Sequence, residues 1–147
     1  MWLILFPGTA LISLIFFSRK GAKTRRQLAK IVVELSLKIH RALGPGLLES
    51  VYEEVLCYEL TKLGLNFKRQ QGIAVVYEDI KMDLGFRADI IIEDKLIVEL
   101  KSLEMVAPVH YKILLTYLRL TNKKLGLLVN FNVELIKDGI KRIVNNL

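Results

Sequence analysis

Apolar residues recur along the chain with two different periods, which predict helices in three stretches and strands in several others. Steps of three and four residues, the period of an amphipathic helix, run through residues 27–43, 47–63 and 108–121. Gly44-Pro45-Gly46 ends the first pattern, Gly64 ends the second, and Pro108 can open the third. The residues predicted to face inward are Leu28, Ile31, Val32, Leu35, Ile39 and Leu43; Leu48, Val51, Val55, Leu56 and Leu60; and Ile113, Leu114, Tyr117 and Leu118.

Short apolar runs, several of them rich in β-branched residues, predict the strands. They cover residues 73–77, 81–92, 96–101 and 125–130, and the last run is almost wholly apolar, as expected of a strand covered on both faces. A closing hairpin is predicted from 133–136 and 140–144, while residues 66–71 are interpreted as a basic edge. The order is helix, helix, three strands, helix, strand and terminal hairpin. We therefore expect an α/β domain with a mixed β-sheet flanked by helices.

The predicted hairpin of residues 81–92 and 96–101 carries two acidic residues, Asp89 and Glu99, within otherwise apolar runs. Residues two apart on a strand point to the same face, so Glu99 and Lys101 face together. A two-residue turn at Glu93-Asp94 would pair Asp89 with Val98 and turn Glu99 away.

A three-residue loop, Glu93-Asp94-Lys95, would instead pair Asp89 with Glu99 and Arg87 with Lys101. This register also gathers a wholly apolar opposite face, and we therefore predict the three-residue loop. The residues of that apolar face would be Ala88, Ile90, Ile92, Leu96, Val98 and Leu100.

Two carboxylates and an ammonium group on one sheet face can hold a hard divalent cation such as Mg²⁺, which keeps open positions for water and a phosphate oxygen. A bound metal ion lowers the pKa of its water and offsets charge on a scissile phosphate. Lys101 would then position the attacking water or stabilise the transition state. The alternative is a salt-bridged patch on a half-exposed sheet, joining Asp89 to Lys101 or Glu99 to Arg87. Spacing alone leaves both interpretations open, because this pattern is common by chance.

The composition fits one globular domain in a chain of 147 residues, since 52% of the residues are hydrophobic and 25% are charged. The formal net charge of +7 favours an anionic partner, either nucleic acid or a membrane surface. The single cysteine, Cys57, excludes an internal disulfide and is predicted to be a buried structural thiol. Two histidines and one cysteine are too few for a zinc cluster.

The N-terminal segment 1–17 contains no charged residue, and Pro7-Gly8 interrupts it. Its length is at the lower limit for crossing a bilayer. One interpretation is a membrane anchor that leaves the folded domain on the cytoplasmic side, with membrane contact through residues 1–26. Another is that the true start of the protein lies downstream of this segment. In either case we separate residues 1–24 from a predicted domain at 25–147. The basic residues that follow the apolar segment are Arg19, Lys20, Lys23, Arg25 and Arg26.

Glu49 and Tyr52 lie in the first turns of the second predicted helix, three residues apart and therefore on one face. A glutamate at this position gains from the positive end of the helix dipole, which is sufficient to explain it. The functional alternative is a third acidic group presented to the metal pocket.

Several blocks of the sequence, in order, resemble the GxxExxY protein family. Gly46-Leu47-Leu48-Glu49-Ser50-Val51-Tyr52 resembles the motif that names the family, and Arg87-Ala88-Asp89 and Val98-Glu99-Leu100-Lys101 resemble two blocks downstream. Residues 40–45, 108–110, 126–132 and 137–142 match as well. The resemblance spans roughly residues 25–146, and spaced blocks in order make it specific.

That family is placed within the PD-(D/E)XK nuclease-like superfamily, so the resemblance implies a mixed sheet flanked by helices and a metal-dependent site for phosphodiester hydrolysis. By matching position, the catalytic residues would be Asp89, Glu99 and Lys101, with Lys101 as the catalytic lysine. Mg²⁺, or Mn²⁺ in its place, would be held by Asp89, Glu99, the carbonyl of Leu100 and, through water, Glu49. Two tyrosines, Tyr52 and Tyr117, match the family pattern and would support the site.

The chain departs from the family pattern at Ile113. Members of the family usually carry a glutamine there, four residues before the tyrosine matched by Tyr117, and an isoleucine cannot hydrogen-bond. The predicted function is a metal-dependent nuclease that hydrolyses DNA or RNA. The alternative is a catalytically weakened nuclease-fold domain that binds nucleic acid or a protein partner without turnover. The sequence distinguishes neither DNA from RNA nor the oligomeric state.

Overall fold

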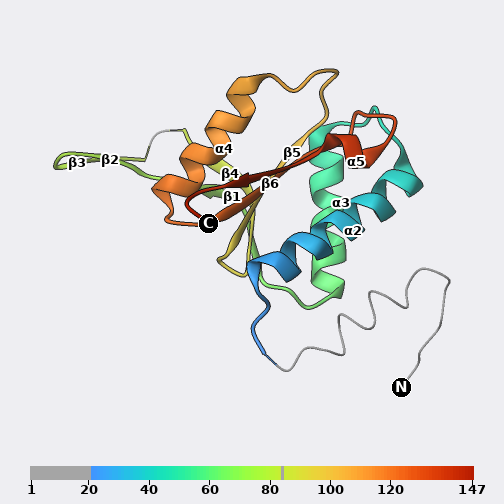
Figure 1. Cartoon of the computed structure of the whole chain (residues 1–147), viewed down its shortest axis with the longest axis horizontal. Helices are drawn as coiled ribbons and strands as arrows, with labels where there is room; N and C mark the ends of the chain where they lie inside the picture. Colours follow the sequence, from blue (N-terminus) through green and yellow to red (C-terminus); the bar gives the residue numbers. More distant parts are fainter. Residues whose placement is uncertain (1–20, 84) are drawn as a thin grey trace.

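A five-stranded mixed sheet runs through the middle of the fold, with helices on both faces (Figure 1). The structure is a computed structural model that describes residues 21–83 and 85–147. In their order across the sheet, the strands are β1 (Phe67–Gly72), β4 (Arg87–Ile92), β5 (Leu96–Lys101), β6 (Leu125–Asn130) and β7 (Ile140–Val144). β5 and β6 run parallel, and the other neighbouring strands run antiparallel. The predicted α/β fold with a mixed sheet is confirmed.

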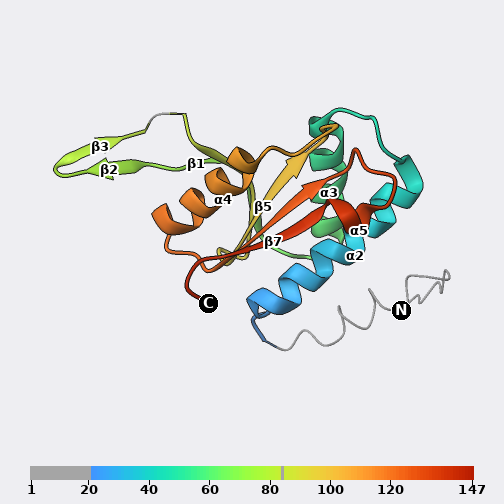
Figure 2. The ribbon, with the colours of Figure 1, turned by 45° about the horizontal axis from the view of Figure 1, so that its top comes forward.

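Two layers of helices cover the sheet. α2 (Arg25–Leu43) and α3 (Glu49–Lys62) cover one face together with the short α5 (Ile136–Gly139), whereas α4 (Pro108–Leu120) covers the other (Figures 1 and 2). α2 begins with a capping box, in which Thr24 and Gln27 exchange side-chain-to-backbone hydrogen bonds. The three long helices match the three helical patterns of the sequence closely.

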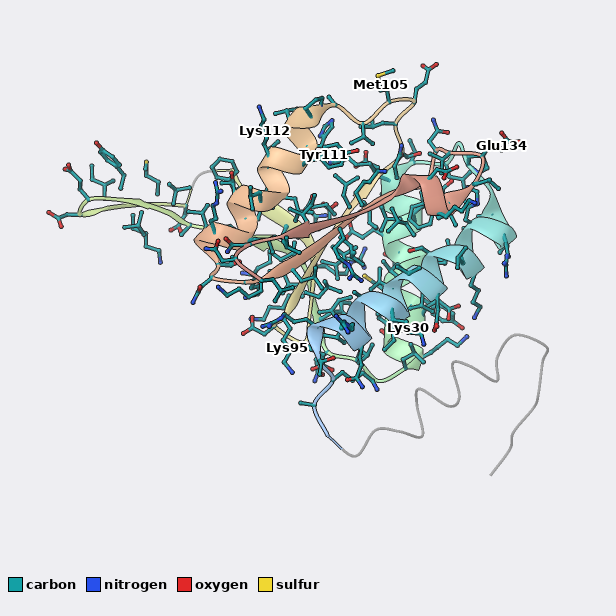
Figure 3. All side chains as sticks on the ribbon, viewed as in Figure 1. Lys30, Lys95, Met105, Tyr111, Lys112 and Glu134 are labelled. Atoms are coloured by element: carbon teal, nitrogen blue, oxygen red, sulfur yellow. The ribbon has the colours of Figure 1, made fainter. Side chains whose placement is uncertain are left out.

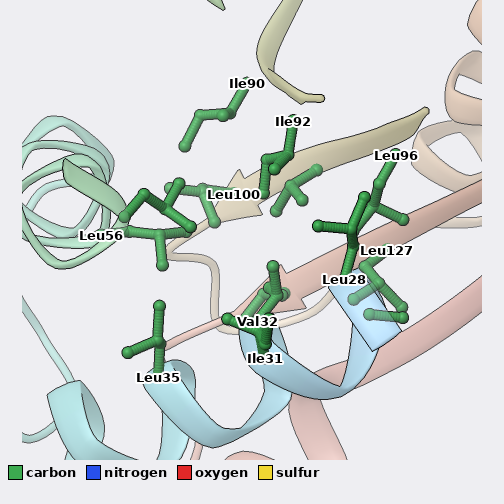
Figure 4. Close-up of a cluster of buried hydrophobic side chains, with 14 of the residues drawn as sticks. Leu28, Ile31, Val32, Leu35, Leu56, Ile90, Ile92, Leu96, Leu100 and Leu127 are labelled. Carbon is green, nitrogen blue, oxygen red and sulfur yellow. The ribbon is translucent and has the colours of Figure 1, made fainter. Parts of the chain in front are cut away.

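The main core lies between the sheet and the α2–α3 layer. Side chains of α2 point toward the sheet, where they meet apolar residues of three strands (Figure 4). A second, smaller core lies under α4, so β6, between the two cores, is buried at all six positions. The main core includes Leu28, Ile31, Val32, Leu35, Leu56, Ile90, Ile92, Leu96, Leu100 and Leu127.

The inward face of α3 differs from the prediction. Leu56 and Leu60 are buried as expected, but the two apolar residues predicted at the start of this face are exposed, and Tyr52 is fully buried instead. The physical reason is that α3 begins at Glu49, so Leu48 precedes the helix, and that Tyr52, stacked on Phe131, turns into the core in place of Val51. The exposed fractions are 74% for Leu48, 37% for Val51 and, at the end of α2, 41% for Leu43.

Cys57 lies in the main core on α3, where it is 3% exposed. Burial raises the pKa of its thiol to about 11. The prediction of a buried structural thiol is confirmed.

The β4–β5 hairpin has the predicted three-residue loop. Ile90 pairs with Val98 and Ile92 with Leu96, which leaves residues 93–95 as the loop. The face toward α2 and α3 is apolar as predicted, except that Ala88 packs in the core under α4. The pairing of β4 with both neighbouring strands is interrupted at Asp89, the residue after Ala88, and Ala88 faces the other side of the sheet.

Residues 66–71, interpreted as a basic edge, in fact provide most of β1, the edge strand beside β4. β1 is an edge strand rich in polar residues, so it contains no apolar run that would predict a strand. The predicted strand at 73–77 and the beginning of the one at 81–92 contribute instead to a separate ribbon of β2 (Val75–Tyr77) and β3 (Ile80–Met82). This ribbon extends away from the body of the fold (Figure 2).

The predicted closing hairpin is wrong. α5 takes the place of its turn, and β7 pairs with β6. Gly139, the last residue of α5, lies so close to the end of β6 that a Cβ atom there would be 2.1 Å from the carbonyl oxygen of Asn130. This close approach allows the chain to pass from α5 directly into β7.

The predicted apolar segment 1–17 lies outside the described residues, so its interpretation as a membrane anchor stays a prediction. In residues 21–83 and 85–147, no helix is both long enough and apolar enough to cross a membrane.

Candidate active site

β4 separates from both of its neighbouring strands at Asp89. On the β1 side, the pairs before and after this position form, whereas Gln70 and Asp89, which lie opposite one another, are not paired. On the β5 side, pairing ends one position earlier, at Ile90 and Val98, so Asp89 lies opposite Glu99 without a ladder pair. The side chains of Asp89 and Glu99 can therefore enter hydrogen bonds that a regular ladder would reserve for the backbone.

The carboxylates of Asp89 and Glu99 bind backbone amides of the opposite strand. The Leu100 N–H donates to Asp89 Oδ2 at 2.8 Å, and the Asp89 N–H donates to Glu99 Oε1 at 3.0 Å. In the described part of the chain, the ion pairs of the salt-bridge alternative, Asp89–Lys101 and Glu99–Arg87, are not formed. The two carboxyl groups are thus held close together without a cationic side chain between them.

Glu99 is 6% exposed, and its carboxyl group has an unusual affinity for protons. Burial and the nearby carboxylate of Asp89 raise the pKa of Glu99 from 4.5 to about 8, although the ammonium group of Lys101 acts in the opposite direction. A buried carboxyl group beside a second carboxylate is therefore protonated near neutral pH, and a cation placed between the two groups would favour its ionisation.

This raised pKa predicts how the stability of the protein depends on pH. The folded state keeps a proton on Glu99 that the unfolded state has lost, so the free energy of unfolding should fall as the pH rises from 4.5 to about 8. In EDTA, the Glu99→Gln variant should lack this part of the decline. We expect it to exceed the wild type in stability at pH 9 by on the order of 3 kcal/mol, with a much smaller difference at pH 5. Urea unfolding at both pH values measures this.

The matched control for this experiment is Glu104→Gln, because Glu104 is an exposed residue of the loop after β5. Its pH profile should follow that of the wild type. If Glu99→Gln also follows the wild type, then Glu99 does not retain its proton in the folded protein.

Lys101 is half-buried on the same face of β5 as Glu99, and its backbone is fixed from β6. The Phe131 N–H donates to the Lys101 carbonyl oxygen at 2.9 Å. The buried side chain of Asn130 binds both backbone groups of Leu103, at 3.0 and 2.9 Å. These contacts define the end of β5 and the path of the chain that leaves the site.

Tyr52 is buried beneath the loop before α3, where its contacts are with Phe131, Gly44 and Leu47. Its ring stacks on that of Phe131, with a centroid distance of 4.2 Å and an angle of 5° between the planes. Its hydroxyl group donates to the Gly44 carbonyl oxygen at 2.6 Å and accepts from the Leu47 N–H at 3.2 Å. Tyr52 therefore links the loop before α3 to the residue that binds the backbone of Lys101.

Glu49 lies at the beginning of α3, beside the residue that follows Lys101. Its Oε2 accepts a hydrogen bond from the Ser102 N–H at 3.4 Å, and the Ser102 hydroxyl donates to the Leu47 carbonyl oxygen. Glu49 thereby reaches the Lys101 end of β5. A cavity of about 500 Å³ opens at this point, lined by Gly46, Leu47, Leu48, Glu49, Ser50, Ser102 and Asn132.

The site does not contain a closed cage of metal ligands. Within residues 21–83 and 85–147, no three His, Cys, Asp or Glu side chains converge closely enough to hold a metal ion. Mg²⁺ seldom needs such a cage, because it usually takes one or two protein carboxylates and completes its shell with water and phosphate oxygens. The paired carboxyl groups of Asp89 and Glu99, of which Glu99 is buried and favours its proton, fit that requirement.

Tyr117 of α4 is buried near the two carboxyl groups. The pKa of the Tyr117 hydroxyl group is raised mainly by burial and, to a smaller extent, by the charge of Glu99. Its ring meets that of Phe86 edge to face, with 5.9 Å between the centroids. Ile113, one turn earlier in α4, packs against the core under the helix and offers no hydrogen bond to the site.

Gln70, which approaches Asp89, and Glu53, which binds Gln70, were not predicted from the sequence. Glu53 is 8% exposed and lies one turn after Glu49 on the same face of α3. Its carboxylate accepts hydrogen bonds from Arg69 Nε at 3.1 Å and from Gln70 Nε2 at 2.8 Å. Gln70 Nε2 also lies 3.3 Å from Asp89 Oδ1. The spacing of four residues from Glu49 could have indicated Glu53, whereas no pattern in the sequence marks Gln70.

One protein-family model matches most of the chain. Residues 26–143 match the model of the PD-(D/E)XK nuclease superfamily, and this region contains Glu49, Asp89, Glu99 and Lys101. Comparisons with curated proteins and with solved structures gave no match. The match covers most of the chain and agrees with the mixed sheet flanked by helices. The chain therefore belongs to the PD-(D/E)XK nuclease superfamily.

Proposed function

We propose that the protein is a metal-dependent nuclease that hydrolyses phosphodiester bonds of nucleic acid. The observation that carries the proposal is the carboxyl pair of Asp89 and Glu99 on adjacent strands, with Lys101 on the same face as Glu99. Membership of the PD-(D/E)XK nuclease superfamily supports it, because nucleases of this superfamily typically use divalent metal ions. The net charge of +7 suits a polyanionic substrate.

In this proposal, Asp89, Glu99 and the carbonyl group of Leu100 hold Mg²⁺ or Mn²⁺, with Glu49 contributing through water. The ion supplies a polarised water and positive charge near the scissile phosphate. The protein keeps the two carboxyl groups close together before the ion arrives, because backbone amides of the opposite strands hold them. Tyr117 of α4 lies close enough to them that the charges of Glu99 and Asp89 add to the effect of burial in raising the pKa of its hydroxyl group.

Lys101 is proposed as the catalytic lysine. Its ammonium group lies close enough to Glu99 to lower the pKa of that carboxyl group, and it is not engaged in an ion pair among the described residues. It is therefore available to orient the attacking water or to balance the charge that develops on the phosphate. The fixed backbone of β5 limits the positions that this long side chain can reach.

The test is nuclease activity of the purified full chain with single-stranded and double-stranded DNA and RNA, in Mg²⁺ or Mn²⁺. We expect cleavage that EDTA abolishes and that Lys101→Ala reduces about 100-fold or more, as for the loss of one group that stabilises transition-state charge. The control is Lys112→Ala, because Lys112 points away from the sheet on α4 (Figure 3). Cleavage that survives equally in both variants contradicts the catalytic role of Lys101, and its absence in the wild type refutes the enzymatic proposal.

A second candidate function is binding of nucleic acid without turnover. Ile113, which places an apolar side chain on α4 near the site, motivates it. In that case, binding should weaken steeply with salt but be unchanged by Mg²⁺ or by Glu99→Ala. Fluorescence anisotropy at two salt concentrations, with and without Mg²⁺, distinguishes this candidate from the nuclease.

A further inference from the structure

Gln70 adopts a backbone conformation that glutamine rarely takes. Its φ is +48°, in the left-handed region, which few residues other than glycine and asparagine occupy readily. It lies on β1 opposite Asp89, at the one position where the β1–β4 ladder is interrupted between formed pairs. Backbone strain of this kind persists where surrounding contacts impose it, and it is concentrated at functional sites.

The side chain of Gln70 connects α3 to Asp89. Its amide nitrogen lies 2.8 Å from Glu53 Oε2 and 3.3 Å from Asp89 Oδ1. An amide nitrogen carries two hydrogen atoms, so it can donate to both carboxylates at once. This assignment also fixes the orientation of the amide, because its oxygen atom would repel both carboxylates.

Glu53 is itself held in place, so it can fix the position of the Gln70 amide. It is 8% exposed, and Arg69 binds its other oxygen atom at 3.1 Å while also pairing with Glu54 at 2.8 Å. The guanidinium group therefore holds Glu53 in place, and Glu53 in turn holds the amide of Gln70. The amide thus reaches Asp89 from β1 while it is also bound to α3.

The two oxygen atoms of Asp89 are thus held by two donors from different strands. The Leu100 N–H of β5 binds Oδ2 at 2.8 Å, and Gln70 Nε2 of β1 approaches Oδ1 at 3.3 Å. We propose that Gln70 is a positioning residue that orients the Asp89 carboxylate for metal binding. The inference rests on the proposed function, since it concerns the same metal site.

The left-handed backbone of Gln70 allows a variant that tests the positioning role without destabilising the fold. Asparagine tolerates a positive φ better than glutamine does, so Gln70→Asn should not strain the fold. Its side chain is one methylene group shorter and cannot span from Glu53 to Asp89. The variant should therefore keep its unfolding midpoint but lose the orientation of Asp89.

The experiment is a Mn²⁺ titration of the full chain, followed by electron paramagnetic resonance. Gln70→Asn and Gln70→Leu should each bind Mn²⁺ about tenfold more weakly, the lower end of the effect of losing a residue that orients a metal ligand, because Gln70 is exposed. Gln71→Leu is the matched control, since the Gln71 amide binds the Gly72 carbonyl oxygen and not a carboxylate. Gln71→Leu should bind Mn²⁺ as the wild type does.

A second measurement needs no metal ion. In EDTA, hydrogen exchange of the Leu100 amide should be faster in Gln70→Leu than in the wild type, because a less constrained Asp89 accepts its hydrogen bond less persistently. The amides of Ile97 and Val98 provide internal references. Unchanged Mn²⁺ affinity in both Gln70 variants overturns the inference while the metal site stands. If the wild type binds no Mn²⁺, the proposed function fails. In that case the positioning role is still tested by hydrogen exchange, and an unchanged exchange rate of the Leu100 amide in Gln70→Leu overturns it.

Discussion

Asp89→Asn should weaken the binding of Mn²⁺ by about 100-fold or more, because an amide oxygen carries no charge and a two-carboxylate site then has one carboxylate left. The same change should lower the pKa of Glu99, since the charge of Asp89 is, after burial, the largest contribution that raises it. Calorimetric titration with Mn²⁺ measures the first effect. The second appears as a smaller loss of stability between pH 5 and pH 8.

Asp79→Asn makes the same chemical change at an exposed turn between β2 and β3, and it should bind Mn²⁺ as the wild type does. Equal affinity in the Asp79 and Asp89 variants would mean that the ion binds elsewhere. Equal and negligible affinity in the wild type would mean that the carboxyl pair no longer serves as a metal site, which favours binding of nucleic acid without turnover.

Gly139→Ala should destabilise the fold by about 3 kcal/mol and lower the thermal midpoint by about 10 °C. The added Cβ atom would lie 2.1 Å from the carbonyl oxygen of Asn130 and 3.0 Å from a methyl group of Val133. A backbone carbonyl group at the end of β6 cannot rotate away as a flexible side chain would, so α5 must shift. The shift would reach the site as well, because the side chain of Asn130 holds the loop after Lys101.

Gly72→Ala is the matched control for this change. A Cβ atom at Gly72 meets nothing within 4 Å, and the residue is at the exposed end of β1. We expect a change in the free energy of unfolding within about 0.5 kcal/mol. Thermal and urea unfolding of both variants measure the difference, and a Gly139→Ala protein as stable as Gly72→Ala would contradict the packing argument.

The register of the β4–β5 hairpin could be predicted from the sequence because it depends on local pattern. Only one loop length places the acidic residues together and the apolar residues on the opposite face, and that loop is formed. Ala88 lies on the opposite side from the one predicted, because Asp89 next to it leaves the ladder and hydrogen-bonds with residues of two other strands, β1 and β5.

The residues that surround the carboxyl pair could not be predicted in the same way. Gln70 of β1 reaches Asp89 and is held by Glu53 of α3, and β1 itself carries no apolar run that marks a strand. The first turn of α3 differs from the prediction for a related reason. Leu48 and Val51 fit a helical stripe by spacing, but the stacking of Tyr52 on Phe131 decides which side of α3 faces the core.

Labelling of Cys57 can measure how often the α2–α3 layer separates from the sheet. It is the one cysteine of the sequence, it lies 3% exposed between α2, α3 and the sheet, and its thiol has a pKa of about 11. Since the thiolate is the reactive form, a thiol reagent at pH 8 can react at an appreciable rate only in molecules whose α2–α3 layer has separated. The rate of labelling therefore measures how often the helical layer beneath the carboxyl pair detaches, without any engineered probe.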